Sequence, residues 1–278
     1  MEKLEAALAK AREARKAAAA PVGDEIASVG RDRPQAEVAA TGNWLALPEL
    51  SLSKDHARQH RLTALIGGKD ATPYDMLRSR TIRMMRESGW QRVAITSPNS
   101  ACGKSTVAMN LAITMARQTD TKVMLIDLDV RRPSLHKLLG HMPARSFHEV
   151  LAGLCPAEEV LVRIGPNLAI ATNNSAARQP AELLHSARAA EVLADMSRSW
   201  MPDVTIFDMS PMLASDDNVG FMGNVDCALL IAAAESTTLA NIDACEKELA
   251  QLTNVLGVVL NKCRYSDEAA GYGYENYE

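Results

Sequence analysis

The sequence predicts an α/β protein whose mainly parallel β-sheet is flanked by helices. From about Thr72 onward, short runs rich in β-branched residues alternate with longer stretches that have helical spacing. Several of these short runs are apolar without alternation, as strands covered on both faces are. A Gly-Lys-Ser triplet at residues 103–105 follows the first such run, which is the context of a phosphate-binding loop.

Composition and charge fit a globular protein of the reducing cytoplasm. The chain has 278 residues, 47% of them apolar and 23% charged, so it can bury a full core without disulfides. Its net charge of −4 argues against general binding to nucleic acid or anionic membranes. The five cysteines are scattered and contain no C-x-x-C pair, which argues against a disulfide framework or a zinc site. Neither a signal peptide nor a spanning helix is expected, so membrane contact should come only through a partner.

Two segments are expected before the main domain. Residues 1–20 are rich in Ala, Glu, Lys and Arg with apolar residues at helical spacing, which predicts an N-terminal amphipathic helix. Its apolar stripe is thin, so a solvated helix and a partner-docking helix are alternative interpretations. Residues 21–71 lack a sustained period and contain three prolines, which predicts a flexible linker. The apolar patch between Trp44 and Leu50 is expected to lie on the domain surface.

The predicted P-loop domain spans residues 72–264, and a tail follows at 265–278. The expected strands are 92–96, 122–127, 168–172, 204–208, 228–232 and 255–260. The expected helices are 73–88, 104–118, 180–199 and 238–251. Strands that are separated by helical crossovers are typical of a parallel sheet.

Residues 96–112, TSPNSACGKSTVAMNLA, form the strongest candidate site. Backbone N–H groups at a helix N-terminus bind anions, so nucleotide phosphates are expected over this loop. Lys104 can reach the β- and γ-phosphates, and the Ser105 hydroxyl can bind Mg²⁺. The loop departs from the usual pattern, because Pro98 replaces its first Gly and Ala101 leaves it poor in glycine. Its predicted nucleotide-binding residues are Ser100, Ala101, Cys102, Gly103, Lys104, Ser105 and Thr106.

Three acidic residues stand at the ends of predicted strands. Asp127 and Asp129 come at the end of one strand, and Asp208 ends another. Open α/β sheets bind ligands beside the carboxyl ends of their strands, so these carboxylates can hold the waters of Mg²⁺ or accept a hydroxyl proton. The alternative for Asp129 is a helix cap, which would leave Arg131 and Arg132 as exposed charges.

These motifs resemble those of bacterial tyrosine kinases (BY-kinases) of the capsular and exopolysaccharide type, including their free-standing members. The most specific piece is LIDLDVRRPSLH (125–136), which is similar to the second Walker-type motif of that family. QPAELLHS (179–186) and VLGVVLNK (255–262) also resemble family segments, and the opening MEKLEAALAKAREAR is similar to the N-terminal helix of free-standing members. The resemblance covers about residues 72–278 and implies the partition-ATPase (SIMIBI) branch of the P-loop NTPases.

The resemblance implies an ATP- and Mg²⁺-dependent protein-tyrosine autokinase. Its catalytic residues would be Lys104, Asp127, Asp129 and Asp208. Asp127 and Asp208 would position the metal through its waters, with Ser105 as a further metal-binding residue. Asp129 would orient or deprotonate the attacking tyrosine hydroxyl.

Four further residues receive roles from the same resemblance. Thr106 would contact the phosphates together with Lys104 and Ser105, and Asn261 would lie near the adenine. Arg132, with Arg131 beside it, would contact a phosphate or a neighbouring subunit.

The C-terminal tail carries the expected acceptor residues. Four of the five tyrosines of the chain, Tyr265, Tyr272, Tyr274 and Tyr277, fall within residues 265–278. The same segment has four acidic residues and no Lys or Arg, which predicts a solvated tail that an active site can capture. The alternative is a disordered tail without a chemical role.

The resemblance also implies partners. A homo-oligomer is expected, although the E-x-x-R-x-x-R ring-contact run of the family is incomplete, with Thr72 and Asp75 at its first two key positions and only Arg78 at the third. Because no spanning segment is expected, a separate transmembrane chain-length-regulator (Wzz-type) adaptor would activate the kinase and bring it to the inner membrane.

Two other functions fit parts of the sequence. A partition or Min-type positioning ATPase would carry an extra Lys early in the phosphate loop, where Asn99 stands, and would not need tail tyrosines. A nucleotide-binding pseudokinase that acts as a scaffold for polysaccharide export is the other alternative, and phosphotyrosine labelling with ATP and Mg²⁺ would distinguish the two from a kinase.

Overall fold

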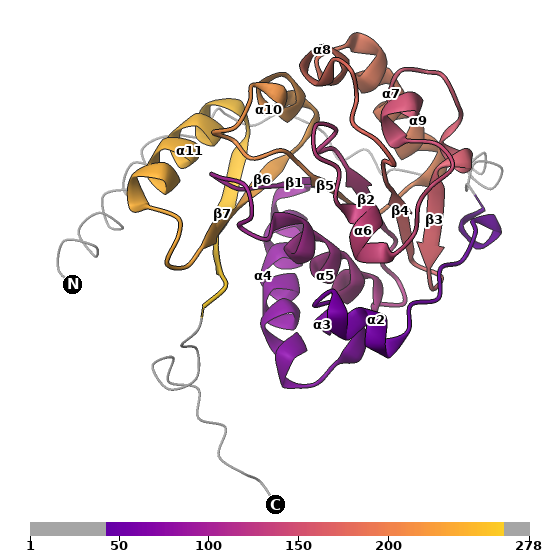
Figure 1. The fold of residues 1–278 in the computed structure, drawn as a ribbon, viewed down its shortest axis with the longest axis horizontal. Coiled ribbons are helices and arrows are strands. Elements are labelled where there is room, and N and C mark those ends of the chain that lie inside the picture. The colour runs from indigo at the N-terminus through magenta and orange to yellow at the C-terminus, as the bar shows by residue number, and fades with distance from the viewer. Residues whose placement is uncertain (1–42, 264–278) are drawn as a thin grey trace, which may run out of the picture. The chain divides into compact units, whose positions relative to one another are not determined.

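The computed structural model describes residues 43–263, so the predicted helix at 1–20, the first half of the predicted linker and the tyrosine-rich tail lie outside the described residues. Seven strands form one sheet: β1 (Arg92–Thr96), β2 (Val123–Asp127), β3 (Leu161–Ile164), β4 (Leu168–Ala171), β5 (Val204–Asp208), β6 (Cys227–Ala233) and β7 (Asn254–Asn261). Their order across the sheet is β3-β4-β2-β5-β1-β6-β7 (Figure 1). Every neighbouring pair is parallel except β3 with β4. The predicted mainly parallel sheet is therefore confirmed.

Helices flank this sheet on both faces. The α-helices are α2 (Lys54–Gln59), α3 (Thr63–Ile66), α4 (Thr72–Ser88), α5 (Lys104–Ala116), α6 (Leu135–Leu139), α7 (Phe147–Leu151), α8 (Pro180–Leu184), α9 (Ala187–Trp200), α10 (Asp217–Phe221) and α11 (Leu239–Leu252). Short 3₁₀ turns add η2 (Trp44–Ala46), η3 (Lys69–Ala71), η4 (Ala157–Glu159) and η5 (Met222–Asn224). No helix within residues 43–263 is both long enough and apolar enough to cross a membrane.

Alternating residues of the strands pack into two separate hydrophobic cores, one on each face of the sheet. Val93 and Ile95 of β1 pack with helices α2 to α6, whereas Ala94 faces the core under α7, α9, α10 and α11. Side chains alternate between the faces of a strand, so an uninterrupted apolar run serves both layers. The sheet is thereby packed on both faces, and the carboxyl ends of its parallel strands lie along one edge.

Local signals explain where the flanking helices begin and end. Pro73 occupies the first turn of α4, and Gly89 ends that helix with a φ of 69°, a left-handed conformation that suits glycine. Ser186 accepts a hydrogen bond from the N–H of Ala189 and so caps α9. That cap also breaks the predicted helix 180–199 into α8 and α9.

The second half of the predicted linker differs from the expectation. Residues 54–59 and 63–66 form α2 and α3, and Leu62 between them is fully buried. Trp44 is also buried, and its Nε1 donates to the Trp200 carbonyl oxygen at 2.9 Å. Isolated apolar residues pack individually here, and this produces no periodic pattern in the sequence.

The strand β3 was also not expected. It forms an antiparallel hairpin with β4 through a turn at Gly165, which has a φ of 64°. Residues 48–50 cover the outer side of β3: the N–H of Leu50 donates to the Arg163 carbonyl at 2.8 Å, and Arg163 pairs with Glu49 at 2.8 Å. This edge of the sheet is thus closed by the segment predicted to be a linker.

Candidate active site

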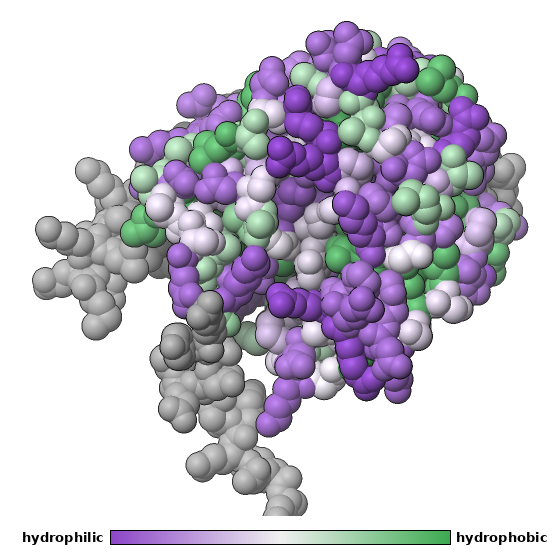
Figure 2. All heavy atoms as spheres, in the orientation of Figure 1, coloured by the Kyte–Doolittle hydropathy of each residue, from purple (hydrophilic) through white to green (hydrophobic). Residues whose placement is uncertain are grey.

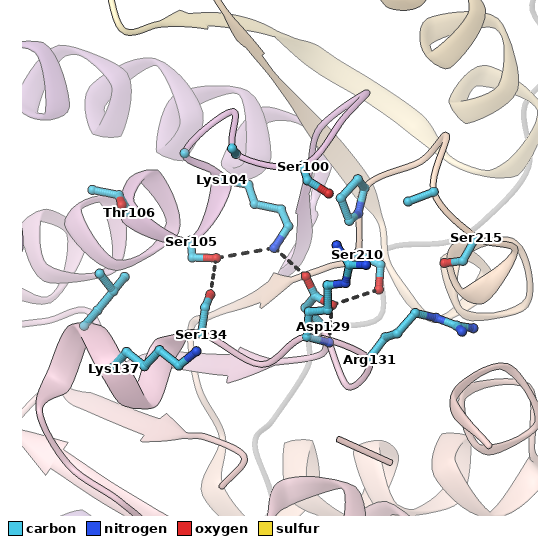
Figure 3. Close-up of a pocket in the computed structure, with 16 residues that line it drawn as sticks. Ser100, Lys104, Ser105, Thr106, Asp129, Arg131, Ser134, Lys137, Ser210 and Ser215 are labelled. Atoms are coloured by element: carbon cyan, nitrogen blue, oxygen red, sulfur yellow. Dashed lines mark hydrogen bonds and ion pairs between the residues drawn. The ribbon is translucent and has the colours of Figure 1, made fainter. Parts of the chain in front are cut away.

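The predicted site residues meet at the carboxyl edge of the sheet. The phosphate loop joins β1 to α5, and strand register places Asp127 of β2 directly opposite Asp208 of β5. A cavity of about 460 Å³ opens beside them (Figure 3). Its walls are formed by Ser100, Ala101, Gly103, Lys104, Ser105, Thr106, Asp129, Arg131, Arg132, Ser134, Lys137, Leu138, Ser210, Pro211, Ala214 and Ser215.

The end of β7 braces the phosphate loop. Asn261 donates its Nδ2 hydrogen to the carbonyl of Cys102 at 2.9 Å, and Lys262 donates to the carbonyl of Ala101 at 2.7 Å. Gly103 has a φ of 90°, and a Cβ there would lie 2.3 Å from Nδ2 of Asn261. Glycine is therefore required at this position, whereas Ala101 adopts its own positive φ of 64° despite its side chain.

Lys104 is the central cation of the site. Its Nζ lies 2.8 Å from Asp129 Oδ2 and 3.6 Å from Asp208 Oδ1, and its side chain is about one-tenth exposed. Burial alone would lower the pKa of Lys104, but the charges of Asp208 and Asp129 raise it overall. The ammonium group is therefore charged at neutral pH and available to an incoming phosphate.

Asp127 and Asp208 are fully buried side by side. Burial raises the pKa of Asp127 well above the usual carboxyl range, and the neighbouring charge of Asp208 raises it further. Burial also raises the pKa of Asp208, although Lys104 counteracts this effect. Within residues 43–263, neither carboxylate oxygen of Asp208 accepts a hydrogen bond of normal geometry. An unsatisfied buried carboxylate is costly, so this position fits a bound cation or its waters.

The donor set suits Mg²⁺, which prefers oxygen ligands and retains several waters in nucleotide sites. Ser105 and Asp208 lie near the same ammonium group: the Ser105 Oγ is 3.4 Å and Asp208 Oδ1 is 3.6 Å from Lys104 Nζ. Ser134 donates to the Ser105 hydroxyl at 2.8 Å and so adds a second hydroxyl to this wall. The site therefore contains a carboxylate that lacks hydrogen bonds of normal geometry, together with hydroxyl oxygens, at the place where the sequence predicts the metal.

The structure separates the roles of Asp127 and Asp129. Asp127 Oδ2 accepts the N–H groups of Ser134 and Leu135 at 3.3 and 3.2 Å, so Asp127 holds the start of α6. Asp129 lines the cavity instead, and its Oδ1 accepts the N–H of Arg132 at 3.0 Å. The helix-cap alternative for Asp129 is wrong, because that contact closes a turn before α6 and the capping carboxylate is Asp127.

The two neighbouring arginines have different surroundings. Arg131 makes two hydrogen bonds to Asp217, at 3.0 and 2.8 Å, and Asp217 is fully buried. Burial would raise the pKa of Asp217, but the hydrogen bonds from Arg131 and Ser215 lower it overall. The Arg132 side chain is exposed at the cavity, where it has no ion pair with any residue of the described part of the chain.

Sequence reasoning missed several residues of this site. Ser210 lies 3.4 Å from both Asp129 Oδ1 and Asp217 Oδ2, which links the loop after β5 to the central carboxylates. Ser134 lies within the family-like run and Lys137 directly after it, and Asp217, in the segment that follows β5, carries no sequence signal of its own. Serine hydroxyls are too common to mark a site without the fold.

A second cavity of about 850 Å³ lies on the other side of the phosphate loop. Its walls are formed by Arg61, Thr63, Lys69, Asp70, Pro73, Tyr74, Gly103, Thr106, Asn261 and Lys262. It shares Gly103 and Thr106 with the first cavity and brings Asn261 beside the loop, where the sequence predicts the nucleoside. Cys102 contributes only its backbone, since its buried Sγ faces the Thr237 hydroxyl at 3.6 Å. The four tail tyrosines lie outside the described residues.

The residues of the incomplete ring-contact run interact within the chain. Asp75 pairs with Arg78 at 3.4 Å and with Arg117 at 3.2 Å. Arg78 therefore has a partner on its own helix, and Arg117 joins α4 to the end of α5.

Comparison with known proteins first defines a nucleotide-binding class. The family model described as the CobQ/CobB/MinD/ParA nucleotide binding domain matches residues 93–272, and it includes the phosphate loop and all three site carboxylates. The predicted fold class is confirmed by this match and by the parallel sheet.

Within that class, the chain belongs to the bacterial tyrosine kinase family. It is 31% identical to tyrosine-protein kinase YwqD of Bacillus subtilis over 185 residues, which cover 66% of this chain and 76% of that protein. It is 32% identical to putative tyrosine-protein kinase EpsB of Ralstonia solanacearum over 68% of this chain, but spans only 25% of the length of EpsB. The kinase domain of Escherichia coli tyrosine kinase ETK superposes with a TM-score of 0.68 at 26% identity, covering 83% of this chain and 94% of that domain. The predicted family is therefore confirmed.

Proposed function

We propose that this protein is a protein-tyrosine kinase that uses ATP and Mg²⁺ to phosphorylate its own C-terminal tyrosines, Tyr265, Tyr272, Tyr274 and Tyr277. The observation that carries the proposal is the cavity-facing carboxylate of Asp129, which is bonded to the phosphate-loop Lys104 at 2.8 Å. A base for the acceptor hydroxyl and a cation for the transferred phosphate thus stand next to each other. Phosphoryl transfer needs this combination of positioning and charge stabilisation.

Each site residue has a defined task in this reaction. Asp129 accepts the proton of the tyrosine hydroxyl while the tyrosine oxygen forms a bond to the γ-phosphorus of ATP. The bond between that phosphorus and the oxygen that bridges it to the β-phosphate breaks, which releases ADP. Lys104 stabilises the negative charge that moves onto the phosphate oxygens. Ser105 would hold Mg²⁺ and Asp127 and Asp208 would position it through its waters, and the ion would supply further positive charge to the phosphates when bound. Asp127 keeps α6, and with it one cavity wall, in position.

The proposal extends to the setting of the kinase. A relative is named as a putative tyrosine-protein kinase in the cps region of Klebsiella pneumoniae, which supports a role in regulating polysaccharide polymerisation and export. On this proposal the protein is cytoplasmic, forms homo-oligomers and reaches the inner membrane through a transmembrane chain-length-regulator adaptor. Binding measured between the full chain and the cytoplasmic tail of the adaptor encoded nearest to it would test that partner.

Labelling of purified full-length protein with ATP and Mg²⁺ tests the kinase activity. We expect phosphotyrosine in the wild type, and mass spectrometry should place it within residues 265–278. Lys104→Met should abolish both nucleotide binding and labelling, and a variant with all four tail tyrosines changed to Phe should bind ATP but remain unlabelled. Nucleotide binding without any phosphotyrosine in the wild type would instead support the pseudokinase scaffold.

A further inference from the structure

Two cations at the mouth of the candidate active site have no assigned partner. Arg132 and Lys137 both line the 460 Å³ cavity and are exposed. Lys137 belongs to α6, and Figure 3 shows it across the cavity from Lys104; Figure 2 shows hydrophilic side chains over the middle of the face that it presents to the viewer. We call Arg132 and Lys137 the cationic rim.

The other two cations that line this cavity have partners within the chain. Lys104 pairs with Asp129, and Arg131 is bonded twice to Asp217. By contrast, neither rim side chain forms a hydrogen bond or an ion pair with any residue between 43 and 263. In a chain with a net charge of −4, two unpaired cations at a cavity mouth point to an anionic ligand.

The rim is fixed to the catalytic machinery through the backbone. The N–H of Arg132 donates to Asp129 Oδ1 at 3.0 Å, so the backbone of Arg132 lies next to the carboxylate proposed as the base. Lys137 lies on α6, whose first N–H groups are held by Asp127. The backbone at both rim residues is therefore tied to the carboxylates of the site, and both side chains are exposed.

The remaining outer wall suits an aromatic ring. Leu138, Pro211 and Ala214 present apolar surface in the same cavity. A tyrosine ring could pack on these side chains inside a cavity whose walls also carry Asp129, Arg132 and Lys137. A polypeptide with acidic residues next to its tyrosines complements this arrangement.

We infer that the cationic rim, Arg132 and Lys137, selects acceptor tyrosines that are flanked by acidic residues. This inference rests on the proposed kinase function and names its substrate class as acidic, tyrosine-rich polypeptide segments. The segment 265–278 of this chain is one such sequence, because it combines four tyrosines with four acidic residues and no cation. The rim contributes to acceptor binding and has no part in the chemical step.

The test compares two synthetic acceptor peptides with the full-length protein at saturating Mg²⁺·ATP. One peptide has the sequence of residues 265–278, and the other replaces its four acids by the amides Asn and Gln. Exposed ion pairs contribute about 0.2–1 kcal/mol each, so two pairs should lower the KM of the acidic peptide by roughly 2- to 30-fold relative to the amide peptide. High salt should reduce this ratio towards one. Phosphorylated peptide is quantified by mass, which separates it from labelling of the chain itself.

The double variant Arg132→Gln/Lys137→Gln should abolish the discrimination by raising the KM of the acidic peptide alone. Arg83→Gln, which removes an exposed arginine of α4 away from the cavity, is the matched control and should retain the ratio. Equal KM values for the two peptides in the wild type would overturn the rim while leaving the kinase function intact. Weaker ATP binding by the double variant with an unchanged peptide ratio would assign these cations to the nucleotide phosphates and also overturn it. Absence of labelling of both peptides and of the tail would instead refute the proposed function.

Discussion

Replacing Lys104 by Met should destabilise the protein in a strongly pH-dependent manner. Lys104 is the cation that pairs with Asp129 at 2.8 Å and lies 3.6 Å from Asp208, and both carboxylates are buried. At an effective dielectric constant of about 20, these distances correspond to attractions of about 6 and about 5 kcal/mol before the cost of desolvation is subtracted. Removing one partner of a buried pair typically costs about 3–5 kcal/mol, which is the loss expected near pH 8.

The sign of the pH dependence follows from the buried carboxylates. Asp127 and Asp208 have raised pKa values in the folded protein, so the folded state holds their protons more tightly than the unfolded state does. Their contribution to stability is full below the unfolded pKa of about 4 and is lost as pH rises through the raised folded values. Without Lys104 these pKa values rise further, so the loss caused by Lys104→Met should grow from pH 5 to pH 8.

Urea denaturation at both pH values, followed by the fluorescence of the buried Trp44 and Trp200, measures this difference. At pH 5 the loss should be smaller than at pH 8, because the raised pKa values keep these buried carboxyls protonated at the lower pH. Lys247→Met, which changes an exposed lysine of α11, is the control and should have little effect at either pH. An equal loss at pH 5 and pH 8 would show that Lys104 acts through packing and would refute the electrostatic argument.

Three further predictions address single residues. Asp129→Asn should leave ATP affinity nearly unchanged and lower tyrosine labelling by about 10²- to 10⁴-fold, whereas an equal fall in both would assign Asp129 to nucleotide or metal binding. Asp208→Asn should weaken Mg²⁺-dependent labelling and flatten the pH dependence of stability, measured by denaturation from pH 5 to pH 8, because one buried carboxylate is removed. Trp44→Ala should cost about 3–5 kcal/mol in urea denaturation, against little for Leu45→Ala, which is 65% exposed; similar losses in both variants would contradict the packing of Trp44.

The central strands were predictable because their burial leaves a direct mark on the sequence. β1 and β5 have the predicted bounds, and β2 starts one residue later than expected, since continuous apolar runs are required between two helical layers. The segment around Trp44 and the edge strand β3 have no comparable sequence pattern. Their stability comes from contacts between distant residues, such as Trp44 with Trp200, and no local pattern encodes a contact across that separation.

The site was predictable to the extent that its residues stand at strand ends. Lys104, Asp127, Asp129 and Asp208 could be named because a strand followed by an acid or by Gly-Lys-Ser is a recognisable combination. The division of labour between Asp127 and Asp129 could not be derived, because both precede α6 and only the backbone path decides which carboxylate receives its N–H groups. Asp217 was missed for a similar reason, since its role depends on Arg131 reaching across from another loop.

The Lys104–Asp129 pair couples the two halves of the proposed reaction. In the described structure one ammonium group serves the carboxylate that the acceptor hydroxyl requires, at 2.8 Å. Nucleotide phosphates attract the same ammonium, so their binding competes with Asp129 for Lys104 and releases that carboxylate to accept a proton. Mg²⁺ held near Asp208 would supply positive charge to Asp127 and Asp208, and this charge would favour the ionised forms of two carboxyls whose pKa values burial has raised. On the proposed mechanism Asp129 would therefore be freed when the phosphate is in place, which would tie proton removal to the presence of the group to be transferred.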